Sequence, residues 1–304
     1  MWSTAFGGPR VYPRGRGRGE QLTDLFRVIS DETVGGHRYV HVVPADTATF
    51  ARALAPLVTA HYFDEVEARA RLLRSAQELT LFSSESFEIT EEDVQLALTE
   101  ERDALLPAAW KGDRGKHFDV QRSEFGEIIA AEVLKQIFGT VIPASRIKHK
   151  EIPDQQTRGA DVIGLENERQ QVVTLVLGEV KGSQDRKTPP GVVTGMEVKL
   201  AELVGSRRAL LQELCWLRDH SEEEFAGVCS RIHASFILKR NQLELVLAPL
   251  LVRTADTHHE DDPGKFKSDP DDFGHPIRWV SIVVEGDLFD IAQDVYRIAR
   301  EGAA

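Results

Sequence analysis

Cysteine and long hydrophobic runs are both scarce in this sequence. Its 304 residues include two cysteines, Cys215 and Cys229. A disulfide framework requires more than two, so the sequence indicates a reducing compartment such as the cytoplasm. The longest apolar runs, such as residues 172–178, are far too short to cross a bilayer, and the N-terminus lacks the apolar stretch of a secretory signal. We therefore expect a soluble cytoplasmic protein with no membrane partner.

Positive charge is also in short supply. Lysine and arginine total 37 against 49 aspartate and glutamate residues, which gives a formal net charge of −12 at pH 7. Contacts between basic side chains and phosphates supply most of the non-specific affinity for nucleic acid, and a protein that binds DNA on its own is expected to be basic. The charge argues against an autonomous, high-affinity DNA binder. It does not exclude a protein whose nucleic-acid substrate is delivered by a partner.

The composition divides the chain into three regions. Residues 1–20 contain few apolar side chains, and glycine and arginine alternate at 14–19, which is typical of a disordered tail. Residues 21–116 mix helical and strand patterns without a motif that carries chemistry, so we interpret them as an N-terminal accessory α/β segment that is structural or binds a partner. The elements expected there are a strand at 37–45, helices near 47–60 and 64–79, and a helix capped by Thr90.

Residues 117–304 are expected to form the main domain. A helix predicted from Ser123, its N-cap, to Gly139 is followed by a hairpin from Gly159 to Gly182. The remaining expected elements are a helix at 196–218, two strands joined at 240–242, a polar loop at 254–276, a strand at 277–285 and a helix at 287–300. This order predicts an α/β fold in which a mixed central sheet is flanked by helices.

Two Glu-x-Lys triplets occur in the sequence, and their contexts differ. Glu179 and Lys181 end an apolar, β-branched run that stops at Gly182, which is typical of a strand. Because side chains alternate along a strand, this glutamate and this lysine share one face. Glu197 and Lys199 lie in a segment with helical periodicity, where they would point about 200° apart. We therefore expect only the first triplet to converge on one site.

Asp161 is the expected partner of the first triplet. If the hairpin turns near Gln170, Asp161 falls opposite Glu179, and cross-strand neighbours lie ~5 Å apart. Two carboxylates at that spacing repel each other unless a proton or a cation lies between them. Mg²⁺ prefers carboxylate oxygens and bridges to phosphate, and Lys181 beside it would orient water and stabilise charge on the phosphate. A surface ion pair at the end of a strand is the simpler alternative.

The preceding helix offers a third acidic residue. When the helix is projected at about 100° per residue, Glu127 falls within the apolar arc, whereas Glu124 and Glu132 fall on the polar side. An acid on a buried helical face is costly unless it is paired or binds a metal. We expect Glu127 to contact the metal directly or through water, and a buried salt bridge is the alternative.

The order of these features resembles the PD-(D/E)xK nuclease superfamily. An acidic helix is followed by an aspartate, by Glu-x-Lys on the next strand and by a helix. The segments RSEFGE, RGADVIG and LGEVKGS are more narrowly similar to the HamA family, the effector nucleases of the Hachiman anti-phage defence system, over about residues 120–300. The resemblance implies an enzyme that hydrolyses phosphodiesters of DNA with Mg²⁺ or Mn²⁺ as its cofactor.

The resemblance also assigns roles to individual residues. It implies that Asp161 and Glu179 bind the metal, that Lys181 is the catalytic lysine and that Glu127 is the helix glutamate of the catalytic set. The literal Pro153-Asp154 pair precedes the predicted strand, and we retain Asp161 as the metal-binding aspartate. A HamA-like protein further implies a helicase partner, HamB. The absence of a P-loop motif from this sequence agrees with a motor supplied by another chain.

Two other functions stay open at the level of sequence. One is a non-catalytic adaptor in which a nuclease fold docks a helicase or a nucleic acid. The other is a restriction or junction-resolving endonuclease with its own specificity. The complete set of Asp161, Glu179 and Lys181 disfavours the adaptor, and the lack of a DNA-reading module or a basic surface disfavours the second.

Overall fold

The computed structural model describes residues 24–82, 89–107, 116–150, 159–169, 172–239 and 243–302. In the described part of the chain a six-stranded mixed sheet forms the centre, in the order β1-β2-β6-β5-β4-β3. The strands are β1 (Phe26–Val34), β2 (His37–Pro44), β3 (Val162–Arg169), β4 (Val172–Ser183), β5 (Leu243–Thr254) and β6 (Arg278–Val284). β2, β6, β5 and β4 are mutually parallel, and β1 and β3 are antiparallel strands at the two edges.

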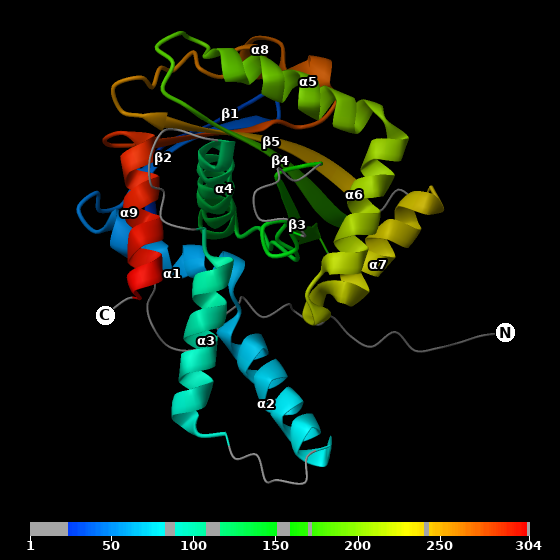
Figure 1. Ribbon diagram of the computed structural model, residues 1–304. Coiled ribbons are helices and arrows are strands. Elements are labelled where there is room, and N and C mark those ends of the chain that lie inside the picture. The colour runs from blue at the N-terminus through cyan, green and yellow to red at the C-terminus, as the bar shows by residue number, and fades with distance from the viewer. Residues whose placement is uncertain are drawn as a thin grey trace, which may run out of the picture.

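Helices cover both faces of this sheet (Figure 1). One face packs against α1 (Phe50–Tyr62), α4 (Lys116–Val133) and α9 (Leu288–Glu301). The other face packs against α5 (Gly191–Gly205), α6 (Arg207–His220) and α7 (Glu223–Ile237). The prediction of an α/β fold with a mixed central sheet flanked by helices is therefore confirmed. Among the described helices, none combines the length and the apolar character needed to span a membrane.

The side chains of the central strand β4 alternate between the two hydrophobic cores that flank the sheet. Val176 and Val180 belong to the core beneath α4, whereas Leu175 and Leu177 belong to the core beneath α5. Side chains alternate along a strand, so a strand buried on both faces is a nearly continuous apolar run. Glu179 is the first charged residue of β4, and it is still buried. The strand therefore carries a carboxylate into the interior.

The first half of segment 21–116 belongs to the central sheet. β2 pairs in parallel with β6, so that Val40 lies beside Val280, and α1 packs against α9. Both contacts cross the boundary expected near residue 116. The strand predicted at 37–45 and the helix predicted near 47–60 are confirmed as β2 and α1. The expected tail, residues 1–20, lies outside the described residues.

The second half of the same segment extends away from the sheet (Figure 1). It contains α2 (Glu65–Phe82), which confirms the helix predicted near 64–79, and α3 (Glu91–Leu105). The two helices form a small core of their own around Phe63, Val94 and Leu98. Thr90 caps α3 as predicted, because its hydroxyl oxygen accepts a hydrogen bond from the backbone N–H of Asp93 at 3.2 Å.

The start of α4 differs from the prediction, and its end agrees. The helix begins at Lys116, so Ser123 lies inside it and is not the N-cap. The error arose because a good capping residue also occurs within helices, and residues 116–122 contain neither glycine nor proline to break the helix. A π-helical turn, η1 (Leu134–Phe138), then leads to Gly139, which ends the helix with a left-handed φ of 68°.

Two elements on the other face were also predicted wrongly. The helix expected at 196–218 is two helices that meet at Ser206, whose side chain caps α6 by accepting from the backbone N–H of Ala209 at 3.2 Å. Of the two strands expected around 240–242, only β5 is a strand, and the preceding residues form α7. A short apolar run fits a helix or a strand equally well, and that ambiguity explains the second error. The expected junction at 240–242 lies outside the described residues.

The acidic segment 254–276 is more ordered than a polar loop. It contains α8 (Lys265–Ser268) and a 3-10 turn, η2 (Pro270–Phe273). Asp262 is fully buried, and its carboxylate accepts a hydrogen bond from Nε of the equally buried Arg253 at 3.0 Å. The guanidinium also donates to the backbone oxygens of Ser183 and Asp185, at 3.1 and 2.7 Å. This buried pair fixes the segment against the end of β4.

Candidate active site

The hairpin of β3 and β4 places Asp161 beside Glu179. Val162 pairs with Gly178, so the next residues outward on each strand are Asp161 and Glu179. The backbone N–H of Asp161 donates to the carbonyl of Gly178 at 2.9 Å, and the N–H of Val180 donates to Asp161 Oδ2 at 2.7 Å. The register predicted from the sequence is therefore confirmed. These bonds hold the Asp161 carboxylate in a fixed position.

Glu179 and Lys181 share one face of β4, as their spacing predicts. Lys181 Nζ lies 2.7 Å from Glu179 Oε1. The glutamate side chain is 1% exposed, while that of the lysine is 35% exposed. Neither carboxylate oxygen of Glu179 accepts a hydrogen bond of regular geometry from the described residues. Glu179 is therefore a buried carboxylate that depends on nearby cations.

A second lysine, Lys199 of α5, completes the contact between the two acids. Its Nζ lies 2.9 Å from Asp161 Oδ1 and 2.5 Å from Glu179 Oε2. On sequence grounds the triplet of Glu197 and Lys199 is dismissed as a site, because its two members diverge on a helix. They do diverge, since Glu197 Oε1 instead accepts from the backbone N–H of Lys265 at 3.3 Å. The dismissal was nevertheless wrong for Lys199, which enters the site alone.

Glu127 approaches the same site from α4. The helix packs closely on β4 here, since a Cβ atom added at Gly126 would be in ordinary van der Waals contact with Val180 Cγ1, at 3.5 Å. Glu127 is 8% exposed, and Ser123 Oγ donates to its Oε1 at 3.4 Å. Burial, followed by repulsion from Asp161, raises the pKa of Glu127 to about 8. The prediction that this glutamate lies on the buried face of its helix is confirmed.

The pKa of Glu179 is raised for the same reasons as that of Glu127. Burial, followed by the negative charge of Asp161, raises the pKa of Glu179 to about 7, and the two lysines act in the opposite direction. The charges of Asp161 and Glu179 in turn raise the pKa of Lys199, although burial opposes this shift. A site with more buried negative charge than its lysines balance favours an additional cation or proton.

The residue types fit a divalent cation. Glu127, Asp161 and Glu179 offer carboxylate oxygens, which are the ligands that Mg²⁺ and Mn²⁺ prefer. The buried oxygens of Glu179 without regular hydrogen bonds agree with this donor set. In the described residues, however, no three acidic, histidine or cysteine groups are arranged to hold a metal ion, and the Lys199 ammonium lies between two of the carboxylates. A bound metal would therefore need that ammonium to move.

The two neighbouring acids of α4 do not lie on an exposed polar face, contrary to the prediction. Glu124 is 3% exposed, forms an ion pair with Lys150, and accepts a hydrogen bond from the Tyr62 hydroxyl at 2.5 Å. Glu132 lies 3.2 Å from His61 Nε2 and 2.7 Å from Lys135 Nζ. The helical projection failed here because α1 and the residues after η1 cover that side of α4. The literal Pro153-Asp154 pair lies outside the described residues.

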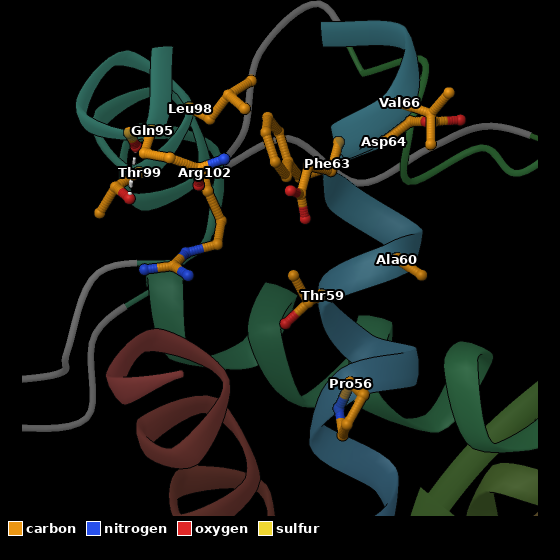
Figure 2. Close-up of a pocket in the computed structure, with 11 residues that line it drawn as sticks. Pro56, Thr59, Ala60, Phe63, Asp64, Val66, Gln95, Leu98, Thr99 and Arg102 are labelled. Carbon is orange, nitrogen blue, oxygen red and sulfur yellow. Dashed lines mark hydrogen bonds between the residues drawn. The ribbon is translucent and has the colours of Figure 1, made fainter. Parts of the chain in front are cut away.

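A separate cavity of about 460 Å³ lies between α1, α2 and α3 (Figure 2). Phe63, Leu98 and Arg102 are among its lining residues, and Figure 2 shows these side chains between α1 and α3. None of the catalytic candidates lines it. The cavity is therefore distinct from the cluster of carboxylates and lysines at the end of β4.

Comparison with known proteins identifies the family. The family model of HamA matches residues 23–252, which include Glu127, Asp161, Glu179, Lys181 and Lys199. A search of curated proteins found no match. The matched range also covers β1 to β4 and all but the last two residues of β5, and thus most of the central sheet. The chain belongs to the HamA family, and it is a protein of the Hachiman anti-phage defence system.

Proposed function

We propose that this protein is a metal-dependent nuclease of the PD-(D/E)xK type that hydrolyses phosphodiesters of DNA. The observation that supports this most strongly is a single ammonium group, that of Lys199, within 2.9 Å of both Asp161 and Glu179. Two carboxylates held this close at the end of a buried strand, with Lys181 beside them, form a set of acids and a lysine that suits metal-assisted hydrolysis of a phosphodiester.

In this proposal the acidic residues bind the metal, and the lysine acts on the substrate. Asp161 and Glu179 would hold Mg²⁺ or Mn²⁺, with Glu127 as a third ligand, directly or through water. When bound, the cation supplies positive charge that neutralises the phosphate and makes water more acidic. Lys181, at 35% exposure, has an ammonium group that can reach solvent and substrate. It orients the attacking water and stabilises the negative charge that develops on the phosphate.

The second part of the proposal concerns the partner. A protein of charge −12 gains little from phosphate contacts, so it binds free DNA weakly at physiological salt. A helicase of the HamB kind would grip the nucleic acid and control the nuclease. Membership of a defence family supports such control, because an effector that was always active would damage its own cell.

The test of the activity is Lys181→Ala. We expect this variant to lose cleavage of plasmid DNA by at least a hundredfold while it retains the fold and binds Mn²⁺ with nearly wild-type affinity, because the role of Lys181 lies in the transition state. Lys267→Ala, on an exposed residue of α8, is the matched control and should cleave as the wild type does. Cleavage by Lys181→Ala within a few-fold of wild type would contradict the mechanism. Absence of cleavage by the wild type, even with Mg²⁺ and its partner, would favour the non-catalytic adaptor.

A further inference from the structure

Lys199 differs from the two acids that it contacts in its freedom to move. Asp161 is held by the backbone N–H of Val180, and Glu179 is almost completely enclosed. Lys199 reaches the two acids from α5, on a flexible side chain that is 37% exposed. The two carboxylates are therefore fixed, whereas the cation between them has a path into solvent.

The contacts of Lys199 also involve both acids. Its ammonium lies against Asp161 Oδ1 and Glu179 Oε2, while Lys181, of these two acids, contacts Glu179, through Oε1. A divalent cation binds carboxylate oxygens at ~2.0–2.1 Å, closer than the ammonium does. An ion that used the same two oxygens would lie directly against a positively charged nitrogen. The two cations exclude each other from this position.

We propose that Lys199 is a built-in competitor of the metal, which fills the cation position between Asp161 and Glu179 and must withdraw before a divalent ion binds. This inference rests on the proposed function, since it concerns the metal of that same site. The ammonium keeps the metal-free protein folded by neutralising two buried acids. The ammonium also lowers the apparent affinity for the metal, because a metal ion must displace the ammonium before it can bind.

Two consequences follow for the metal-free and metal-bound forms. Without metal, Lys199 stabilises the folded chain, so its removal lowers the melting temperature. With metal, the same removal makes binding tighter. If Lys199 served only to stabilise the fold, its removal would lower the melting temperature without making metal binding tighter.

The experiment is calorimetric titration of Mn²⁺ alone into the full-length protein at pH 8.5. Wild type is compared with Lys199→Met, which keeps the aliphatic length and removes the charge. We expect Lys199→Met to bind Mn²⁺ at least tenfold more tightly. Its melting temperature should be lower than that of the wild type without metal, and Mn²⁺ should raise it by more degrees.

The matched control is Lys181→Met, which also removes one positive charge beside Glu179. The ammonium of Lys181 lies 2.7 Å from Glu179 and that of Lys199 lies 2.5 Å from it, and the two lysine side chains are almost equally exposed. A general electrostatic effect of losing a lysine would increase Mn²⁺ affinity equally in both variants. The proposal requires a gain several-fold larger for Lys199→Met, with Lys199→Arg close to the wild type. Equal affinities in wild type and Lys199→Met, or weaker binding in the variant, would overturn the competition and leave the nuclease proposal standing. Absence of Mn²⁺ binding in all four proteins would overturn both.

Discussion

At the scale of the residue, Glu127 is the most unusual side chain of the site. A buried acid normally has a cationic partner, yet the hydrogen bond that Glu127 accepts comes from a serine hydroxyl. Its pKa of about 8 reflects burial first and the charges of two other acids second. In the absence of metal the folded protein therefore holds a proton on this group at neutral pH. If Glu127 binds the metal as proposed, metal binding is coupled to release of this proton.

The first prediction concerns the pH dependence of stability. An unfolded glutamate ionises near 4.5, and the folded value is about 8, so the folded state binds the proton more tightly between these values. The resulting stability is complete below pH 4.5 and is lost as the pH rises through 8. We expect the free energy of unfolding of the metal-free protein to fall by about 1–2 kcal/mol between pH 7 and pH 9.

The control for this prediction is Glu127→Gln, which keeps the shape and cannot ionise. Urea unfolding at several pH values should show a smaller decrease for this variant than for the wild type. The window above pH 7 is chosen because the histidines whose pKa burial lowers, such as His41, His149 and His258, titrate below it. An unchanged slope in Glu127→Gln would mean that this carboxyl group is ionised in the folded state.

Four charged side chains are in contact at the end of β4, and sequence patterns predicted three of them. Sequence patterns also predicted Glu127, which approaches from α4. Asp161, Glu179 and Lys181 followed from the period of two and from hairpin register, both of which are local rules. Lys199 could not be found in this way. It is 38 residues from Asp161 in sequence, and its contact depends on how α5 packs across the sheet. The only sequence signal was its position next to the buried stripe of α5, where Met196 and Leu200 face the core.

At the scale of the element, α4 is held in place by a buried polar network that the sequence did not reveal. Glu124 links this helix to Lys150 and to Tyr62 of α1, and the Tyr62 hydroxyl lies 3.0 Å from that of Tyr296 in α9. All three helices of that face thus meet at one point. The contact fixes the rotation of α4, and Glu127 lies one turn further along the same helix. The network therefore helps to set the position of a candidate active-site side chain.

The second prediction follows from this network. Glu124→Gln removes the charge that faces Lys150, and both side chains are almost fully buried. We expect the free energy of unfolding to fall by about 1–3 kcal/mol, measured by urea denaturation, because an unpaired buried charge remains. Glu100→Gln, on an exposed position of α3, should change it by less than about 0.5 kcal/mol. Equal stability of Glu124→Gln and wild type would show that the ion pair contributes nothing.

The predicted elements were most reliable where the pattern was long and local. The strands β2 and β4 and the helices α1 and α2 were found close to their observed bounds. The sequence was misleading at 223–237, where α7 contains apolar residues such as Phe236 and Ile237 in a short run that also suits a strand. It also could not show that β2 joins β6, since that pairing brings together residues more than 230 positions apart. Long-range packing decides such cases.

At the scale of the whole molecule, the distribution of structure suggests a division between catalysis and control. The carboxylates and lysines lie where β4 meets α4 and α5, whereas α2 and α3 extend from the opposite side of α1 (Figure 1). Large apolar side chains are exposed on these two helices, among them Val66 and Leu96. Segment 21–116 therefore contains both sheet strands and a protruding helical pair, and we expect the partner to contact the latter part.

The last prediction is that the isolated protein cleaves DNA weakly and that a helicase partner increases its activity. A net charge of −12 removes most of the counterion-release free energy that drives non-specific binding, and this loss is largest at physiological salt. The purified chain should therefore degrade plasmid and single-stranded DNA slowly at ~150 mM salt, and faster at low salt. Addition of a helicase of the HamB kind should raise the rate at least tenfold, with Lys181→Ala plus helicase as the control for contaminating nucleases. Rapid degradation by the protein alone at physiological salt would refute partner dependence, and it would leave the assignment of Asp161, Glu179 and Lys181 intact.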